Sequence, residues 1–368
     1  MQAFYSPIQP GIFKTTPKHF GIGGYRGIVD ALGIALSIGF SLRKLRTAYT
    51  GNCVTIRRSS DDTTTDIGFT AAGDFDNAAF FAFCGRNFLL NTATLSTQSV
   101  TVVPKTYVLS FQGTGTVTLS GTSTAGPLVG TGASNRVSLA FTPTAGSLTL
   151  TVSGSVTSAQ LEFGSTASTY ESRAGTAASG GFITTWFDQS GNAQDVTQGT
   201  AANQPRLVPR QQGEKPLAYG DGTDDLQAAY IGTDTNFAIV AVGSIVASGG
   251  YQAFASFGYE VMYASFPGNG WGTYNGAEIN ASTAGPTAKS CCVVNARNYN
   301  DVDLVKNGTL SNHTTGTVYN ARAGTGVFSD AANKVAGDIY EVFLLSSALS
   351  SGQLSSLNAS AKSYWGTP

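Results

Sequence analysis

The stretch WFDQSGN, residues 186–192, places two large aromatic side chains directly before five small polar residues. The run that contains its start, FITTWF at residues 182–187, has the aromatic and β-branched composition of a strand. Asp188 and Ser190 can accept hydrogen bonds from turn amides, and Gly191 and Asn192 adopt positive φ at little cost. The stretch therefore predicts a corner that ends a strand and locks two halves of a β-sandwich. We interpret it as scaffold rather than as a site.

The composition also favours an all-β chain. Only 12% of the 368 residues are charged and 45 are Gly, which suits short strands and tight turns better than helices. The net charge of −1 argues against a whole-chain polyanion binder. Residues 1–60 do carry eight basic residues against the single acid Asp30, but no nucleic-acid motif accompanies them. We therefore expect no nucleic-acid partner.

Cysteine and histidine usage argues against disulfides and zinc. Four Cys with no CxxC pair, and two His, form neither a disulfide framework nor a zinc-ligand pattern. The DGTDD stretch, residues 221–225, predicts a turn, with a calcium site as the alternative. We expect no metal and no cofactor. The apolar run at residues 31–42 is too short to span a bilayer, so we expect no membrane insertion.

The chain divides into an arm and two β modules. Residues 1–37 begin with a Pro- and Gly-rich segment that predicts an extended arm, ordered by a partner. The texture changes at Arg86, and residues 86–178 are rich in Thr, Ser, Gly and Val, with five strand candidates bounded by turn residues. They predict a second small β-sandwich, inserted into a surface loop of the first. The first sandwich then comprises residues 38–85 and 179–368.

Three short helices are expected in the first sandwich. Leu42, Leu45 and Tyr49 share one face of a helix over residues 41–49. Residues 74–85 predict a second helix, with Asp74 near its start and Gly85 after its end. The last segment, residues 350–365, predicts a third.

Two resemblances add more specific expectations. SLRKLRTAYTGNCVTIRRSSDDTTTDIGF at 41–69, FCG at 83–85 and WFDQSGNAQDVTQ at 186–198 resemble, in this order, the opening blocks of the α-L-arabinofuranosidase B catalytic domain. GDIYE at 337–341 is similar to a late strand of that family. The resemblance implies a concanavalin-like β-sandwich. The same blocks occur in predicted phage virion proteins, and residues 86–171 resemble the phage head spike fibre domain, a structural module.

The arabinofuranosidase resemblance implies a retaining glycosidase, which needs two carboxylates about 5–5.5 Å apart. The acid/base of the family is an Asp ten residues before a Tyr-Glu pair, and Asp330 has that spacing to Tyr340 and Glu341. The Gly-Gly of the family before this Asp is replaced by Phe328 and Ser329. A turn Asp that bonds its own loop is the competing interpretation.

The nearest counterpart of the family's nucleophile is Glu278, without the flanking Asp and Asn of the family. A solvent-facing strand Glu is the competing interpretation. The paired cysteines that the family places against the sugar correspond to Ala253-Phe254 here, and Cys291-Cys292 come after Glu278. Since two carboxylates act as a unit, we expect no enzyme activity, with a retaining α-L-arabinofuranosidase-like activity as the alternative.

The sequence therefore predicts a virion protein of a tailed phage: a head fibre, decoration or tail-associated protein, assembled in the host cytoplasm. The arm would dock on capsid or tail proteins, a homo-oligomer is expected, and the β modules would bind cell-surface glycans. Trp271, Tyr274 and Asn275, in a Gly-rich loop, are the candidate sugar-binding residues. Packing of Trp271 and Tyr274 between sheets is the competing interpretation. A pure capsid cement protein without a glycan ligand is a further alternative.

Overall fold

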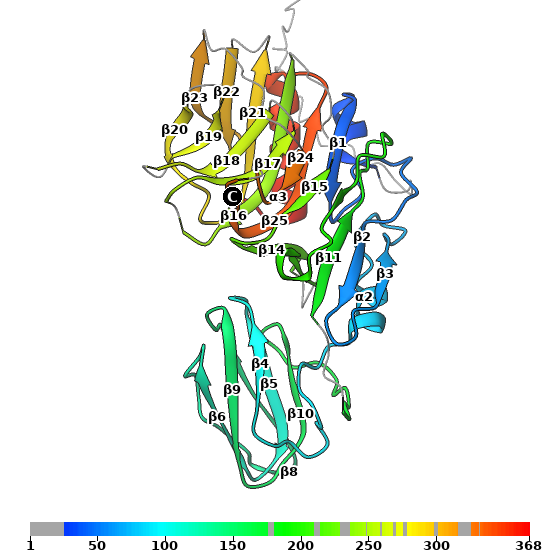
Figure 1. Cartoon of the computed structure of the whole chain (residues 1–368), viewed down its shortest axis with the longest axis vertical. Helices are drawn as coiled ribbons and strands as arrows, with labels where there is room; N and C mark the ends of the chain where they lie inside the picture. The colour runs from blue at the N-terminus through cyan, green and yellow to red at the C-terminus, as the bar shows by residue number, and fades with distance from the viewer. Residues whose placement is uncertain are drawn as a thin grey trace, which may run out of the picture.

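The structure is a computed structural model, which describes residues 26–175, 180–209, 214–228, 236–247, 249–257, 260–267, 270–274, 278–297, 301–315, 325–330 and 332–368. These residues form two β modules joined at a narrow junction, the larger above the smaller in Figure 1. The prediction of an all-β fold built on a β-sandwich is confirmed. None of the helices in the described ranges has the length and hydrophobicity of a membrane span.

The larger module consists of antiparallel strands in two layers. In the first layer, β25 pairs with β16 on one side and with β1 and β14 on the other, and β21, β22 and β23 continue beyond β16. These strands are β1 (Leu36–Ser41), β14 (Leu217–Asp221), β16 (Phe237–Ile245), β21 (Ser290–Arg297), β22 (Asp301–Lys306), β23 (Thr309–Thr315) and β25 (Ala336–Leu345).

The second layer runs from β20 through β19, β18, β17, β24, β15, β12 and β11 to β2 and β3. A further strand, β13 (Arg206–Val208), pairs with both β11 and β14 and so links the layers. The strands of this layer are β2 (Val54–Arg58), β3 (Thr64–Ile67), β11 (Gly181–Trp186), β12 (Val196–Thr197), β15 (Leu226–Ala228), β17 (Gln252–Phe257), β18 (Glu260–Ser265), β19 (Gly270–Tyr274), β20 (Glu278–Ala284) and β24 (Thr325–Val327).

The two central strands are apolar on both faces. Almost every residue of β16 and β25 is buried, rather than every second one. One face packs against the second layer, and helix α3 (Ser351–Trp365) packs on the other, with the Trp365 ring 5.2 Å from that of Tyr340. A capping box between Ser350 and Gln353 starts this helix, which confirms the predicted C-terminal helix. Burial on both faces explains the continuous apolar run FAIVAV in β16 and the mainly apolar run YEVFLL in β25, in which Glu341 is paired with Arg43.

The WFDQSGN corner ends β11 at Trp186, as expected, and clamps β1 from the side. The Asp188 carboxylate accepts from the amide of Gly39 at 2.9 Å and from the amide of Ser190 at 2.9 Å. The Gln189 amide group donates to the carbonyl oxygen of Ser41 at 2.9 Å. Positive φ occurs at Gly191 and Ala193, so Ala193 takes the position expected for Asn192.

The predicted helix over residues 41–49 is wrong. Ser41 is the last residue of β1, and the segment after it is irregular. Leu42 and Leu45 are buried as expected, but Leu45 donates its amide to the Gln189 side chain at 2.7 Å instead of to a helical carbonyl. A distant side chain therefore supplies the hydrogen bond that a helix would otherwise make.

The second predicted helix exists as α2 (Asn77–Cys84), with Gly85 after its end. Its N-cap is Asp76, whose carboxylate accepts from the Ala79 amide at 3.0 Å. Asp74, predicted near the start, instead bonds the Lys215 amine at 3.1 Å. The helix is therefore confirmed, and its cap lies two residues later than expected.

The larger module begins before residue 38, inside the range that the sequence predicted to be the arm. Helix α1 (Ile28–Leu32) packs near α3, and β1 begins at Leu36, so residues 28–37 belong to the larger module. The sequence signal was the concentration of Pro and Gly before residue 25, and residues 1–25 lie outside the described ranges.

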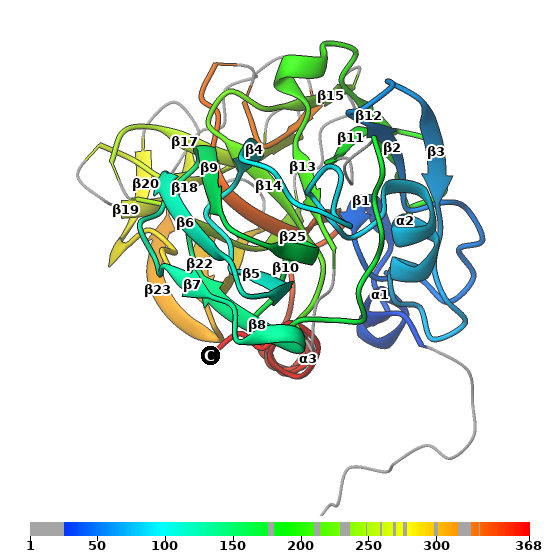
Figure 2. The same cartoon turned by 90° about the horizontal axis from the view of Figure 1, so that it is seen from below.

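The smaller module is built from residues 98–163 in two sheets. One sheet has the order β10-β5-β8 and the other β4-β9-β6-β7. The strands are β4 (Gln98–Val102), β5 (Tyr107–Gly113), β6 (Thr116–Gly121), β7 (Leu128–Val129), β8 (Gly132–Phe141), β9 (Gly146–Ser153) and β10 (Val156–Phe163). No ladder among the described residues joins them to the larger module. Figure 2, viewed from below, shows this module in front of the larger one.

Candidate functional site

A second, smaller group of buried rings lies apart from the main core, on β17 to β19. Successive residues of a strand point to opposite faces, so Phe254, Met262 and Trp271 join the main core while Tyr263 faces the other way. Tyr251, Tyr263, Phe266 and Tyr274 form what we call the outer aromatic cluster. The rings of Tyr263 and Phe266 are 4.8 Å apart and buried, and Tyr251 packs edge-on against both at 5.8 Å.

Asp330 lies at the base of this cluster. The hydroxyl of Tyr263 donates to its carboxylate, and so does the Asn333 side-chain amide, at 3.1 and 3.0 Å to the two oxygens. The backbone amides of Ala332 and Asn333 also donate to it, at 3.1 and 2.7 Å. Only 6% of Asp330 is exposed. The carboxylate thus connects the outer aromatic cluster to the loop that follows β24.

These donors keep Asp330 ionised. Burial alone would raise the pKa of its carboxyl group, but the hydrogen bonds from Tyr263, Asn333 and Ala332 outweigh it, and the pKa falls below the ordinary value for Asp. A general acid in a glycosidase needs the opposite change, because it must hold a proton at neutral pH. The geometry therefore supports the interpretation of Asp330 as a loop-ordering residue.

The two residues before Asp330 also differ from an open sugar pocket. Phe328 adopts φ 68°, a left-handed conformation that Gly adopts without steric cost. Its ring is fully buried against β14, where a Cβ on Gly220 would come within 2.6 Å of the ring. Where the arabinofuranosidase resemblance implies two glycines, this chain holds a large side chain.

The structure describes the side chains of two of the other sequence-predicted site residues, Trp271 and Tyr274. Trp271 has no exposed surface and packs in the main core, and Tyr274 is half-buried against the outer aromatic cluster. Glu278 lies on β20 opposite Tyr274, and its side chain falls outside the described part of the chain. Asn275 also lies outside the described residues. Of the two described candidates for sugar contact, Trp271 and Tyr274, Tyr274 is the one at a partly exposed surface.

The two adjacent cysteines are buried thiols on β21. Cys291 and Cys292 are free, and burial raises the pKa of Cys292 to about 12 and that of Cys291 further still. Protonated thiols in an apolar strand are poor nucleophiles and poor metal ligands. They therefore act as small core residues in this fold.

One cluster of possible metal ligands occurs among the described residues, but an arginine side chain already binds its carboxylates. Asp301, Asp303 and His313 lie together on β22 and β23. The Arg297 guanidinium donates to both carboxylates at 2.8 Å, which supplies the positive charge that a metal ion would supply. The arrangement is an ion-pair network at the sheet surface.

The DGTDD turn holds one carboxyl group in an unusual state. Asp224 is 5% exposed and accepts from the Asp221 amide at 2.9 Å. Burial is the main cause that raises its pKa from 3.8 to about 7, and the nearby Asp221 charge adds to it. Asp225 is already bonded to Gln198 at 2.6 Å and to Lys334 at 3.2 Å. This geometry is that of a hydrogen-bonded turn.

The raised pKa of Asp224 makes stability depend on pH. Between about pH 4 and pH 7 the unfolded chain loses a proton that the folded chain keeps, so stability falls as pH rises through this window. As the pH rises from 4.5 to 8, the parent chain should therefore lose stability that Asp224→Asn keeps. We expect the difference in free energy of unfolding between the two to shift by about 2 kcal/mol in favour of Asp224→Asn, after allowance for solvent screening. Urea unfolding at both pH values measures this. Asp62→Asn, at an exposed position, serves as the control. If the stability difference between Asp224→Asn and the parent chain is the same at both pH values, the pKa of Asp224 is not raised by folding.

Comparison with known proteins gives a fold and no family. No protein family model matches the chain, and no curated protein matches it. The structure is similar to an arabinofuranosidase complexed with arabinofuranosyl-α-1,2-xylobiose, with a TM-score of 0.51. It is also similar to a GH54 α-L-arabinofuranosidase soaked with a cyclic sulfate inhibitor, at 0.51, and to a variant soaked with 4-nitrophenyl α-L-arabinofuranoside, at 0.53.

The matched structures are distant from this chain in sequence and are longer than it. Sequence identity is 14% in each, and the match covers 90% of this chain but 63% of the other. The likeness therefore shows that this chain shares a fold with the three arabinofuranosidase structures. The chain spans less than two thirds of the length of these structures.

Sequence reasoning missed the outer aromatic cluster as a unit. Tyr263 and Phe266 stand in a run, EVMYASF, whose alternation marks a strand but does not say what lies opposite each face. Tyr251 follows two glycines, a sequence signal that points to an aromatic residue in a Gly-rich loop, and the structure shows this side chain 42% exposed.

Proposed function

We propose that this chain binds glycans without cleaving them, and that it acts as an adhesion protein on the particles of a tailed phage. The observation that carries the first part is the state of Asp330. Its carboxylate accepts from Tyr263, Asn333 and the loop amides, and its lowered pKa leaves no proton for a leaving group. A sandwich with an arabinofuranosidase-like fold and this defect supports binding rather than hydrolysis.

The outer aromatic cluster is the proposed contact surface for sugars. Tyr251 is 42% exposed and is held by Tyr263 and Phe266 in a fixed orientation, with Tyr274 at the margin. Aromatic faces stack on the apolar faces of sugar rings, and rings that are already immobilised lose little entropy on binding. The arabinofuranoside ligands of the similar structures suggest the first probes.

The virion part of the proposal is supported by sequence. Residues 86–171 resemble a phage head spike fibre module, and the Pro- and Gly-rich N-terminal segment has the composition of an extended docking arm. Immunogold electron microscopy of purified particles, with an antibody against the smaller module, is expected to label the capsid or tail. Particles that carry no label would overturn this part. Label that persists while glycan binding is absent would favour a pure cement protein.

Hydrolysis and binding are separated by two assays on the full chain. With 4-nitrophenyl α-L-arabinofuranoside, we expect release of nitrophenol at the rate of the buffer, for both the parent chain and Asp330→Asn. In calorimetry with arabinofuranosyl-α-1,2-xylobiose, we expect binding that Tyr251→Ala weakens about 10-fold, because one stacking contact contributes roughly 1–1.5 kcal/mol.

Leu310→Ala is the matched control, since Leu310 is a 58% exposed apolar residue on β23, away from the cluster. Nitrophenol release that disappears in Asp330→Asn would replace the binding proposal with a glycosidase. Binding that is equal in Tyr251→Ala and Leu310→Ala would exclude the outer aromatic cluster as the contact surface.

A further inference from the structure

Arg206 on β13 is a buried cation without a carboxylate partner. It is 6% exposed, and no acidic residue in the described ranges accepts a hydrogen bond from it. Its one acceptor is the carbonyl oxygen of Thr101 at 3.5 Å, and its Nε has no partner. The rings of Phe88 and Phe163 lie 5.4 and 5.5 Å from the guanidinium. Contacts with two rings offset only part of the cost of burying a charge.

The guanidinium lies in a cleft where the two modules meet. Ser99 and Thr101 of the smaller module form one wall, and Ser59 and Phe182 of the larger module form the other. Among the described residues that line this part of the cleft, none is acidic. Arg206 and Phe182 are also side by side: a Cβ on Gly180 would be 3.0 Å from the Phe182 ring and 3.5 Å from the guanidinium carbon.

The electrostatic environment of the junction favours an anion. Arg58 is paired with Asp61 and Arg173 with Glu171, whereas Arg206 has no ion pair with a carboxylate among the described residues. The buried thiol of Cys84 responds to this environment. Burial raises its pKa to about 12, and the positive charges of Arg58, Arg206 and Arg173 act in the opposite direction.

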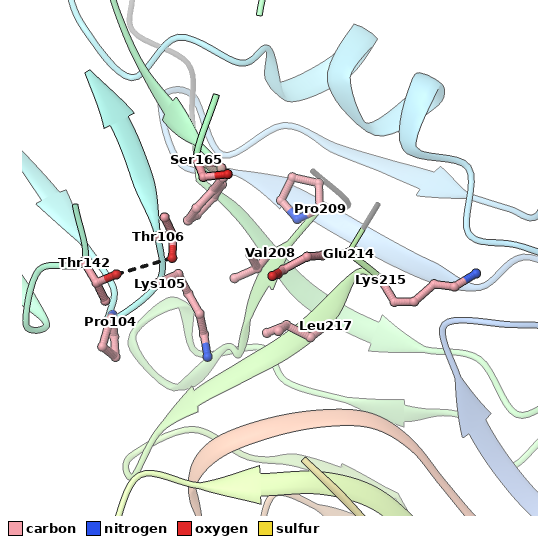
Figure 3. Close-up of a pocket in the computed structure, with 12 residues that line it drawn as sticks. Pro104, Lys105, Thr106, Thr142, Ser165, Val208, Pro209, Glu214, Lys215 and Leu217 are labelled. Carbon is pink, nitrogen blue, oxygen red and sulfur yellow. Dashed lines mark hydrogen bonds between the residues drawn. The ribbon is translucent and has the colours of Figure 1, made fainter. Parts of the chain in front are cut away.

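A neighbouring pocket between the modules provides a contrast. Figure 3 shows its lysines, Lys105 and Lys215, with Glu214 between them. Both amines are neutralised, since Lys105 is 2.5 Å from Asp338 and Lys215 is 3.1 Å from Asp74. Arg206 therefore differs from Lys105 and Lys215 in having no carboxylate partner among the described residues.

We infer that the junction cleft binds an acidic sugar, with the sugar carboxylate on Arg206 and the sugar ring against Phe182. A guanidinium can hold a carboxylate through two parallel hydrogen bonds, and in Arg206 the buried Nε has no partner while, among the described residues, a terminal nitrogen has only the 3.5 Å contact with Thr101. The cleft continues past Phe182 to Gln204 and Tyr219, which can contact further sugar units, and Asp221 and Asp224 also line this part of it. The inference rests on the proposed glycan binding and specifies a second surface and an acidic ligand class for it.

Both modules contribute to this cleft, so the ligand would contact them together. A rival explanation gives Arg206 a structural role alone, as a link between the modules through Phe88 and Phe163. The two explanations differ in what happens when the ligand loses its charge, because a structural link does not depend on a ligand.

The test is calorimetry on the full chain with trigalacturonic acid and with its fully methyl-esterified form. We expect the acid to bind and the ester to bind at least 10-fold more weakly. Arg206→Gln is expected to weaken acid binding at least 10-fold and to remove the difference between acid and ester. Arg206→Lys keeps the charge and loses the second hydrogen bond, so its affinity for the acid is expected to lie between those of the parent chain and Arg206→Gln.

Two further variants separate binding from folding. Gly180→Ala adds a side chain between Phe182 and Arg206 and is expected to weaken acid binding while Arg206 stays in place. Arg136→Gln makes the same charge change on β8 of the smaller module, where Arg136 bonds neutral groups of Ser158 and Ser110 and lines none of the junction pockets described above. We expect it to bind like the parent chain.

Acid binding that Arg206→Gln and Gly180→Ala leave unchanged would overturn the inference, and so would a parent chain that does not bind trigalacturonic acid. Neither result bears on the proposed function itself, because binding of arabinofuranosyl-α-1,2-xylobiose and its loss in Tyr251→Ala are measured separately. Failure of both ligands to bind would reject the two proposals together.

Discussion

Replacing Glu341 by Gln is expected to lower the free energy of unfolding by about 3–5 kcal/mol. Glu341 has no exposed surface, and its two carboxylate oxygens lie 2.7 and 2.8 Å from nitrogens of Arg43, which is 4% exposed. The hydroxyl of Ser41 also donates to it, at 3.0 Å. An amide at this position removes the buried negative charge that faces the Arg43 guanidinium under α3, which is far more costly than the loss of one hydrogen bond.

Urea unfolding of Glu341→Gln and of the parent chain measures this effect. Asp62→Asn removes the carboxylate of an ion pair whose acid is 77% exposed, and is expected to change stability by less than about 0.5 kcal/mol. The double replacement Arg43→Met with Glu341→Leu is expected to recover much of the loss, because it removes both buried charges. Equal stability of Glu341→Gln and the parent chain would show that the pair is not energetically coupled.

Trp271→Ala is the second large effect, at about 3–5 kcal/mol of lost stability. Trp271 is fully buried on the inner face of β19, so its removal leaves a cavity in the main core. We expect no specific loss of glycan binding once the folded fraction is accounted for, whereas Tyr251→Ala should weaken binding with little loss of stability. The two variants therefore give opposite patterns in unfolding and calorimetry.

Leu310→Ala controls for the loss of apolar surface from an exposed strand. A Trp271→Ala protein that keeps the stability of the parent chain but no longer binds arabinofuranosyl-α-1,2-xylobiose would return this residue to the sugar site. Trp271→Phe, which keeps an aromatic ring of smaller volume, is expected to cost less than the alanine variant because it leaves a smaller cavity.

Local chemistry made several elements predictable. The strand that ends at Trp186, helix α2 and helix α3 were predicted from patterns within a few residues, and the structure shows local groups at their ends: turn formers after the aromatics, Asp76 as the cap of α2, and Ser350 with Gln353 at the start of α3. The five strands expected in the smaller module likewise follow from short β-rich runs between turns. Each of these signals acts through the backbone of its own segment.

The segment after Ser41 shows where such reasoning fails. Its spacing of Leu42 and Leu45 fits a helix face, yet the Leu45 amide bonds the side chain of Gln189, which follows 144 residues later. A hydrogen bond from so far along the chain outweighs a local helix preference of a few tenths of a kcal/mol per residue. The sequence contains both partners but no sign that they meet.

The sequence by itself determined the all-β class, the change of texture that accompanies the smaller module, and the chemistry available at Asp330, Glu278 and Trp271. The tertiary structure alone decided which face of a strand each aromatic takes, that Asp330 is enclosed by donors, and that Arg206 has no acidic partner among the described residues. The physical reason is that burial, hydrogen bonding and charge pairing depend on which distant segments pack together, and composition and spacing describe only neighbours along the chain.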